Sequence, residues 1–311
     1  MTLLVPPDPT ESVDTKMDDG AIIRIRRHGN PDGLRIVLSH GNGFAAEAYY
    51  PFWRELLDRC DVVLFDFRNY GQNPFHSADA HQYTRLVADL PLVRGAIDDA
   101  FGARPTLGIF HSLSARANMM YALNSGWLWE AMVLFDPPMV PPPSHWLHEL
   151  TDREMQLFSE WARRRPERFN DPAELALQFA KTRGFGRWVS GAHELAARSV
   201  LRSEGNAWVL ACPGELEARI YEGNGILDIW PRVTDFDRPV LIIASDPEQP
   251  DAQLPATSCR ALAEECGFPY VAIPGTGHFL QIEEPQLCVR EVFEFASQIG
   301  MIDKTYGGIS A

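Results

Sequence analysis

Short runs of continuous apolar residues recur along the first half of the chain and return near its end. Their lengths and their β-branched content are typical of strands that are buried on both faces. They lie at 34–39, 61–66, 106–110, 131–135, 240–244 and 270–273. A partly alternating stretch at 21–27, followed by the turn signal Asn30-Pro31-Asp32-Gly33, predicts one further strand before them.

Segments with the spacing of helices separate these strands. In the stretch 81–101, apolar residues recur every three or four positions, at Leu86, Leu90, Val93 and Ile97. Further helices are expected at 46–59, from 115 onward, at 254–266 and at 285–299. Strands and helices in alternation predict an α/β fold, with a mostly parallel central sheet that helices flank on both faces. In such sheets, ligands bind beyond the carboxyl ends of the strands.

The alternation stops between residues 139 and 230, where no apolar strand run appears. This segment predicts helices instead, each beginning with a residue that favours the N-cap position. The helices and these capping residues are expected at 151–165 (Thr151), 171–181 (Asp171) and 191–201 (Ser190). We therefore expect a core of residues 1–138 and 231–311, interrupted by a helical cap of residues 139–230. The first residues, to about position 20, are rich in Pro, Asp and Thr and are expected to run loosely over the surface.

Composition narrows the class of protein. The 311 residues are 45% hydrophobic and 23% charged, as in ordinary globular proteins, and the net charge of −14 argues against nucleic acid and anionic membranes as partners. The five cysteines are scattered without a C-x-x-C pair, which favours reduced thiols. Because no signal peptide and no membrane-spanning stretch is visible, we expect a soluble cytoplasmic protein. The sequence leaves open whether the protein forms a homodimer.

The stretch 106–120 carries the first candidate for chemistry. Its apolar run turns at His111-Ser112-Leu113-Ser114 and continues into good helix formers. A serine on such a turn lies beside the free N–H groups of a helix N-terminus, which favour the negative charge that an attacked carbonyl develops. Ser112 is therefore a candidate nucleophile, with a purely structural turn as the alternative. Phe110 stands where the usual G-x-S-x-G elbow has glycine, and it needs space of its own.

A base for this serine is found after the last predicted strand. An activated serine needs a base within hydrogen-bond reach and a group that orients the base. Gly275-Thr276-Gly277-His278-Phe279 places a histidine on a glycine-flanked loop beyond a strand end. We therefore expect His278 to act as this base.

Four motifs, in this order, resemble those of the α/β-hydrolase superfamily, and the resemblance covers nearly all of the chain. H-G-N-G-F at 40–44 looks like the oxyanion loop of that family, and D-F-R-N-Y-G-Q-N at 66–73 is similar to its D-x-R-x-x-G-x-S stretch. F-H-S-L-S-A at 110–115 resembles G-H-S-x-G-[GA], and G-T-G-H-F-L-Q-I-E-E-P at 275–285 looks like the histidine loop. The segment 139–230 falls where the family carries its cap.

The resemblance implies a Ser-acid-His triad whose acid follows the strand at 240–244. We favour Asp246, which leaves that strand directly, and keep Glu248, about where many relatives place theirs, as the alternative. Asp136, after the strand at 131–135, is a third option. The oxyanion hole is expected to use the N–H of Leu113 and a donor from the 40–44 loop, where we name Asn42 first and Gly43 next.

These residues predict a carboxylesterase-like serine hydrolase that cleaves esters of small to medium apolar compounds through an acyl-enzyme. Thioester, lactone or carbon–carbon bond hydrolysis on the same triad, or ligand binding without turnover, are the alternatives. No metal or organic cofactor is implied, and the expected partner is a small-molecule ester. We expect Arg163, Arg164 and Arg165 to form a solvated helix end and charged substrates to be poorly used. The expected pocket residues are Phe44, His111, Met139, Trp146, Phe158, Trp161 and Phe279.

Overall fold

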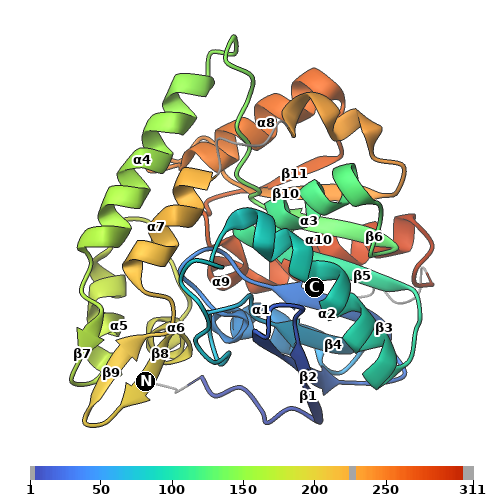
Figure 1. Cartoon of the computed structure of the whole chain (residues 1–311). Helices are drawn as coiled ribbons and strands as arrows, with labels where there is room; N and C mark the ends of the chain where they lie inside the picture. Colours follow the sequence, from blue (N-terminus) through green and yellow to red (C-terminus); the bar gives the residue numbers. More distant parts are fainter. Residues whose placement is uncertain (1–3, 224–228, 304–311) are drawn as a thin grey trace.

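A large twisted sheet occupies the centre of the molecule, in a computed structural model that describes residues 4–223 and 229–303 (Figure 1). Its eight strands are, in spatial order, β1 (Glu11–Lys16), β2 (Ile22–Gly29), β4 (Cys60–Phe65), β3 (Leu34–Ser39), β5 (Thr106–His111), β6 (Ala131–Phe135), β10 (Val240–Ser245) and β11 (Tyr270–Ile273). β2 pairs antiparallel with β1 and β4, and the remaining neighbours are parallel. The predicted α/β class with a mostly parallel sheet is confirmed.

The N-terminal strand β1 was not expected, because the first residues were predicted to run loosely over the surface. β1 pairs with β2 along its whole length, from Glu11 opposite Arg27 to Lys16 opposite Ile22. It lies at the edge of the sheet and none of its residues is fully buried. Such an edge strand carries a polar sequence, so its apolar pattern is too weak to reveal it.

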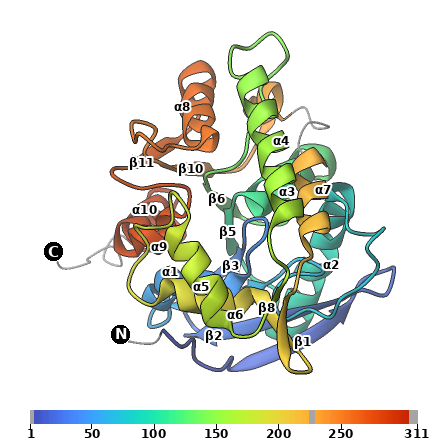
Figure 2. The same cartoon turned by 90° about the vertical axis from the view of Figure 1, so that its left-hand side faces the viewer.

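Helices cover both faces of the sheet, as predicted. One buried cluster joins alternate strand residues to α1 (Tyr50–Trp53), α9 (Leu280–Glu283) and α10 (Pro285–Gln298). The other cluster joins the intervening strand residues to α2 (Tyr83–Phe101), α3 (Leu113–Ser125) and α8 (Leu254–Cys266). In Figure 2, α9 and α10 lie on one side of the strands, and α2 and α3 lie on the other. In place of the single helix expected at 46–59, the structure has the short helix α1 with one 3-10 turn before it and another after it.

The segment after β6 forms an additional layer that contains both helices and strands. It holds α4 (His148–Arg164), α5 (Pro172–Lys181), α6 (Ala192–Val200), α7 (Gly214–Gly223) and a small antiparallel sheet of β7 (Arg168–Phe169), β9 (Ala207–Leu210) and β8 (Leu201–Glu204). The hairpin between β8 and β9 turns at Gly205, whose φ is +62°. The Gly-Asn pair at this turn is a hairpin signal that the prediction of a helical cap overlooked.

Only one of the three expected helix caps in this segment is found. The carboxylate of Asp171 accepts a hydrogen bond from the N–H of Ala173 (2.8 Å) at the start of α5. Thr151 lies inside α4, where its hydroxyl donates to the Leu147 and His148 carbonyls. α6 begins after Gly191, not after Ser190. Because α4 begins at His148, Thr151 is three residues past the helix start and cannot occupy the N-cap position.

Candidate active site

Ser112 lies at the junction between β5 and α3, at the carboxyl edge of the sheet. Its backbone has φ 50° and ψ −111°, a conformation that few residues other than glycine adopt. The Ser114 hydroxyl holds the turn, since it accepts from the His111 N–H and donates to the His111 carbonyl, both at 2.9 Å. Leu113 is the first residue of α3, so its N–H has no acceptor within the helix.

Phe110 finds the space that its position at the turn requires. Its side chain is fully buried and packs on Trp129 with ring centroids 5.6 Å apart. Gly108 lies two residues earlier on the same face of β5, and a Cβ at Gly108 would stand 2.4 Å from the Phe110 ring. The departure from the usual elbow is thus accommodated by a glycine further down the strand.

The imidazole of His278 is oriented by Asp136. His278 Nδ1 donates to Asp136 Oδ2 over 3.1 Å, and the carboxylate is fully buried. Asp136 also accepts from the N–H (2.9 Å) and the hydroxyl (2.5 Å) of Ser245, on the neighbouring strand β10. Because a carboxylate only accepts, Nδ1 carries the proton and Nε2 of the neutral ring is left as the base. Ser112 and His278 line the same cavity.

The expected acid, Asp246, does not contact the imidazole of His278 in the structure. Its carboxylate accepts from the N–H groups of Gly275 and Glu248, both at 2.9 Å, and these hydrogen bonds, Gly275 first, lower its pKa. Asp246 therefore ties the loop before His278 to the end of β10, without bonding the imidazole. Glu248 is exposed and pairs with Arg260. β6 lies next to β5 in the sheet, so a carboxylate that follows β6 is close to the serine turn.

A chain of hydrogen bonds joins three parts of the site through His111. The Gly41 N–H donates to the Tyr49 hydroxyl (3.0 Å), and that hydroxyl bonds His111 Nδ1 (2.7 Å). His111 Nε2 lies 2.8 Å from the His278 carbonyl, which can only accept, so Nε2 carries the proton. Burial lowers the pKa of His111, and the nearby His278 adds to this effect. Tyr49 was not recognised from the sequence; with Nε2 protonated, its hydroxyl donates to His111 Nδ1.

Asn42, the expected oxyanion donor, has a side chain that is already bonded. Its Nδ2 donates to the Glu217 carbonyl on α7 (3.0 Å), and its Oδ1 accepts from the Tyr70 hydroxyl (2.6 Å). These two bonds leave the backbone N–H and the second N–H of the amide as donors on Asn42. Asn42 is among the residues that line the cavity, and Gly43 packs against the Glu217 carboxylate with φ +75°.

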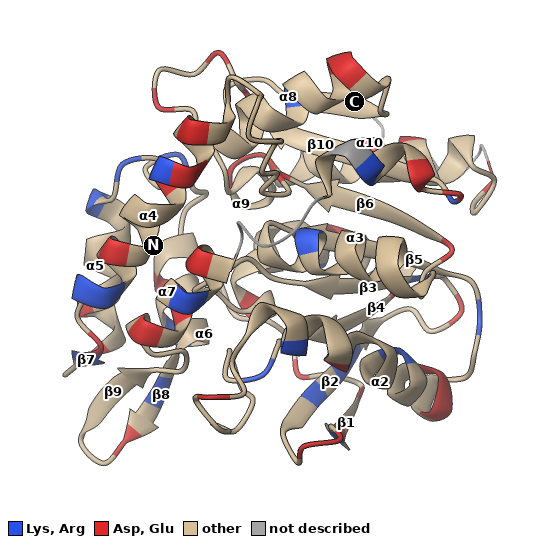
Figure 3. Ribbon diagram, turned by 45° about the horizontal axis from the view of Figure 1, so that its top comes forward, with Lys and Arg blue, Asp and Glu red and all other residues tan. Residues whose placement is uncertain are grey.

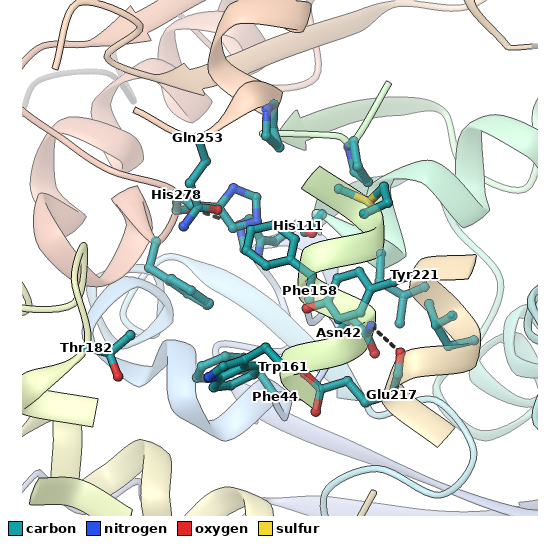
Figure 4. Close-up of a pocket in the computed structure, with 18 of the residues that line it drawn as sticks. Asn42, Phe44, His111, Phe158, Trp161, Thr182, Glu217, Tyr221, Gln253 and His278 are labelled. Carbon is teal, nitrogen blue, oxygen red and sulfur yellow. Dashed lines mark hydrogen bonds between the residues drawn. The ribbon is translucent and has the colours of Figure 1, made fainter. Parts of the chain in front are cut away.

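A cavity of about 380 Å³ lies between the serine turn and the α4–α7 layer (Figure 4). Five of the expected pocket residues line it: Phe44, His111, Phe158, Trp161 and Phe279. Two do not. Met139 is buried in the cluster on the α3 side of the sheet, and Trp146 stands before α4 with 66% of its surface exposed. Apolar character alone did not distinguish these two positions from the cavity wall.

The cavity also contains polar side chains that the sequence analysis did not place there. Arg165 was expected in a solvated helix end, but it is buried and pairs with the buried Glu217 at 2.5 Å. Of its neighbours, Arg163 pairs with acidic residues of α7, and Arg164 is exposed. The other unanticipated polar lining residues are Thr182, Arg183, Tyr221 and Gln253.

Two further features were searched for in the described residues. No group of three or more His, Cys, Asp or Glu side chains gathers there in a way that could hold a metal ion. No helix in that part of the chain combines the length and the apolar character that a membrane crossing requires.

Comparisons with known proteins identify the family of this chain. Residues 36–291 match the model of the alpha/beta hydrolase family, and the chain belongs to that family. By sequence, no curated protein gives a significant match. Similar solved structures include E-2-(acetamidomethylene)succinate hydrolase (TM-score 0.75, 16% identity, 92% of this chain and 100% of the other), a thioesterase domain from the curacin biosynthetic pathway (0.70, 14%, 91% and 99%) and an esterase from Exiguobacterium antarcticum (0.69, 16%, 91% and 98%). At these identities the likeness shows the fold alone.

Proposed function

We propose that this member of the alpha/beta hydrolase family is a serine hydrolase that cleaves carboxylic esters of small to medium size through an acyl-enzyme. One observation carries the proposal. His278 is held by the buried Asp136 and shares a cavity with Ser112, which stands in a strained turn at a helix N-terminus. Nucleophile, base and orienting acid are the parts that acyl transfer by a serine requires.

The reaction would proceed in two halves. In the first, His278 Nε2 takes the proton of the Ser112 hydroxyl while the Ser112 oxygen attacks the ester carbonyl carbon. The backbone N–H groups of Leu113 and Asn42 are the proposed donors to the resulting oxyanion. His278 then protonates the departing alcohol as the tetrahedral species collapses to the acyl-enzyme. In the second half, His278 takes a proton from water as the water oxygen attacks the acyl carbon. His278 then returns this proton to the Ser112 oxygen as the second tetrahedral species collapses, which releases the acid and restores the Ser112 hydroxyl.

Asp136 would stabilise the imidazolium that forms in each half-reaction and would keep Nδ1 protonated. The same triad would serve for thioesters, lactones or carbon–carbon bonds, because the fold hosts all of these reactions. A panel of esters, acyl-CoA thioesters, lactones and β-diketones, ranked by kcat/KM, separates them. We expect the esters to rank first.

Labelling and turnover test the mechanism. A fluorophosphonate probe should label the wild-type protein, and p-nitrophenyl esters should be hydrolysed. The Ser112→Ala variant should lose both, with kcat lower by several orders of magnitude. Ser125→Ala, at the exposed end of α3, is the matched control and should retain both. Folded wild-type protein that resists the probe, or Ser112→Ala protein with undiminished activity, would contradict the proposal.

A further inference from the structure

The charged side chains in the cavity wall do not balance. Apart from His278, the charged residues that line it are Arg165, Arg183 and Glu217. Arg165 lies 2.5 Å from the carboxylate of Glu217, so its guanidinium already has a partner. Arg183 makes no ion pair with any carboxylate in the described ranges, and its guanidinium donates to the Pro250 carbonyl (3.1 Å). The cavity of a protein with a net charge of −14 thus has an uncompensated positive charge in its wall.

Arg183 lies on the loop after α5 and is exposed, so it belongs to the mouth of the cavity. Its contact to Pro250 joins it to the segment that leads into α8. The side chain of Gln253, at the end of that segment, lies beside His278 in Figure 4 and forms no hydrogen bond within the described part of the protein. The cavity therefore offers a guanidinium at its mouth and a free amide beside His278.

Another part of the cavity wall is apolar. Leu157 and Trp161 of α4 line the cavity and are 57% and 45% exposed. Further in, Phe44, Phe158 and Phe179 continue this wall. A molecule that fills the cavity would meet aromatic and aliphatic groups along α4 and a cation at the mouth.

We propose that the natural substrate carries an anionic group, a carboxylate or a phosphate, which Arg183 binds at the mouth while an apolar part lies under α4. This inference rests on the proposed function and names the substrate class. A planar guanidinium with unused N–H groups binds either anion through paired charge-assisted hydrogen bonds, and Gln253 adds a neutral donor. The expectation of poor activity on charged substrates is thereby replaced by a preference for one anionic end.

Matched esters with and without the charge test the inference. p-Nitrophenyl hexanoate and mono-p-nitrophenyl adipate differ at the end of the acyl chain, whereas phenyl butyrate and 4-(phosphonooxy)phenyl butyrate differ on the alcohol. Arg183→Gln should raise KM for at least one anionic ester about five- to tenfold with kcat unchanged, and should leave the neutral esters unaffected. The anionic ester whose KM changes more shows whether Arg183 binds a carboxylate or a phosphate.

Two controls accompany this measurement. Arg164→Gln removes an exposed arginine of α4 that pairs with Glu160 and does not line the cavity, and it should change neither ester of a pair. Added salt should raise KM for the anionic ester in the wild type and have little effect in Arg183→Gln. If Arg183→Gln changes charged and neutral esters equally, or changes neither, the inference is overturned.

Binding without turnover separates this inference from the proposed reaction. Calorimetry on Ser112→Ala protein would compare 6-phenylhexanoate with its neutral amide. A preference for the carboxylate that disappears in the Ser112→Ala/Arg183→Gln double variant supports the inference, even if the wild type cleaves no ester and the proposed reaction fails. Equal affinity for the two compounds in Ser112→Ala protein would overturn it.

Discussion

The core and the proposed cap of this protein differ in how completely their apolar side chains are buried. Residues of the central strands are buried throughout, as in β4, β5 and β6, so their positions are fixed by packing on both faces. The cap keeps large apolar side chains in solvent, including Trp146, Leu150, Leu157, Trp161 and Leu177. Figure 3 shows acidic and basic residues interspersed along its helices.

This difference separates two tasks. Ser112, Asp136 and His278 all follow strands of the core, so rigid elements hold the groups that would react. The cavity wall opposite them comes largely from α4 and the segment after α5, which pack less completely. We therefore expect the core to determine the type of reaction and the cap to determine the selection among substrates. Changes made in each region should affect different kinetic constants.

The largest effect is expected from the acid of the core. Asp136→Asn keeps the shape of the side chain but favours the wrong tautomer of His278, and kcat should fall by about 10⁴-fold. Asp246→Asn is the matched control, because that carboxylate bonds loop N–H groups and not the imidazole, and its effect should stay below about tenfold. Steady-state rates on one p-nitrophenyl ester measure both. A larger loss in Asp246→Asn would return the role of the acid to that residue.

A smaller effect concerns the stability of the core in acid. Burial, with a contribution from Arg26, lowers the pKa of His28 to about 4. In the unfolded chain, the His28 imidazole binds a proton below about pH 6.5, whereas in the folded protein it stays neutral down to about pH 4. The free energy of unfolding is therefore highest above pH 6.5 and decreases as the pH falls toward 4. At pH 5 the loss is about 2 kcal/mol in the free energy of unfolding.

Urea unfolding at pH 7 and pH 5 measures this dependence. His28→Gln should reduce the difference between the two pH values by about 2 kcal/mol, whatever its effect at pH 7. His81, whose pKa burial lowers to about 3, should behave in the same way in a separate variant. An unchanged pH dependence in His28→Gln would show that the folded protein accepts the proton at that site.

The smallest effect is expected for the cap and concerns chain length. In a series of esters from acetate upward, each buried methylene should add up to about 0.8 kcal/mol, a few-fold in kcat/KM, until the cavity is full. Phe158→Ala removes part of the wall beside Tyr221 and should move the optimum to longer chains with little change for acetate. Trp146→Ala, outside the cavity, should leave the profile unchanged. A flat profile would show that these groups do not bind the acyl chain.

The sequence predicts the core closely because burial on both faces leaves a continuous apolar run. The boundaries of β3, β6, β11 and α8 are as predicted. The edge strand β1 and the hairpin of β8 and β9 were missed, since exposed strands have no such run. Local sequence signals predict that Ser112 and His278 each follow the end of a strand. In the structure, both residues line one cavity.

The identity of the acid could not be read in the same way. Asp136 and Asp246 both follow buried strands, and only the path of the loop before His278 decides which of them meets the imidazole. The burial of Arg165 was equally hidden, because its partner Glu217 lies 52 residues further along the chain, on a different helix. Pairings between distant segments depend on tertiary packing and leave no local pattern.

The hydrogen bonds of Asn42 to both the core and α7 limit which parts of this protein could be exchanged with those of its relatives. The Asn42 amide is fixed by Tyr70 from the core and by the Glu217 carbonyl from α7. In a chimera with a foreign cap, the buried Nδ2 would lose its acceptor, at a cost of about 1–3 kcal/mol, and the loop at 40–44 would lose its support. The exchangeable module is therefore the cap together with that loop, and a graft that ignores position 42 would disturb the reacting centre it was meant to leave alone.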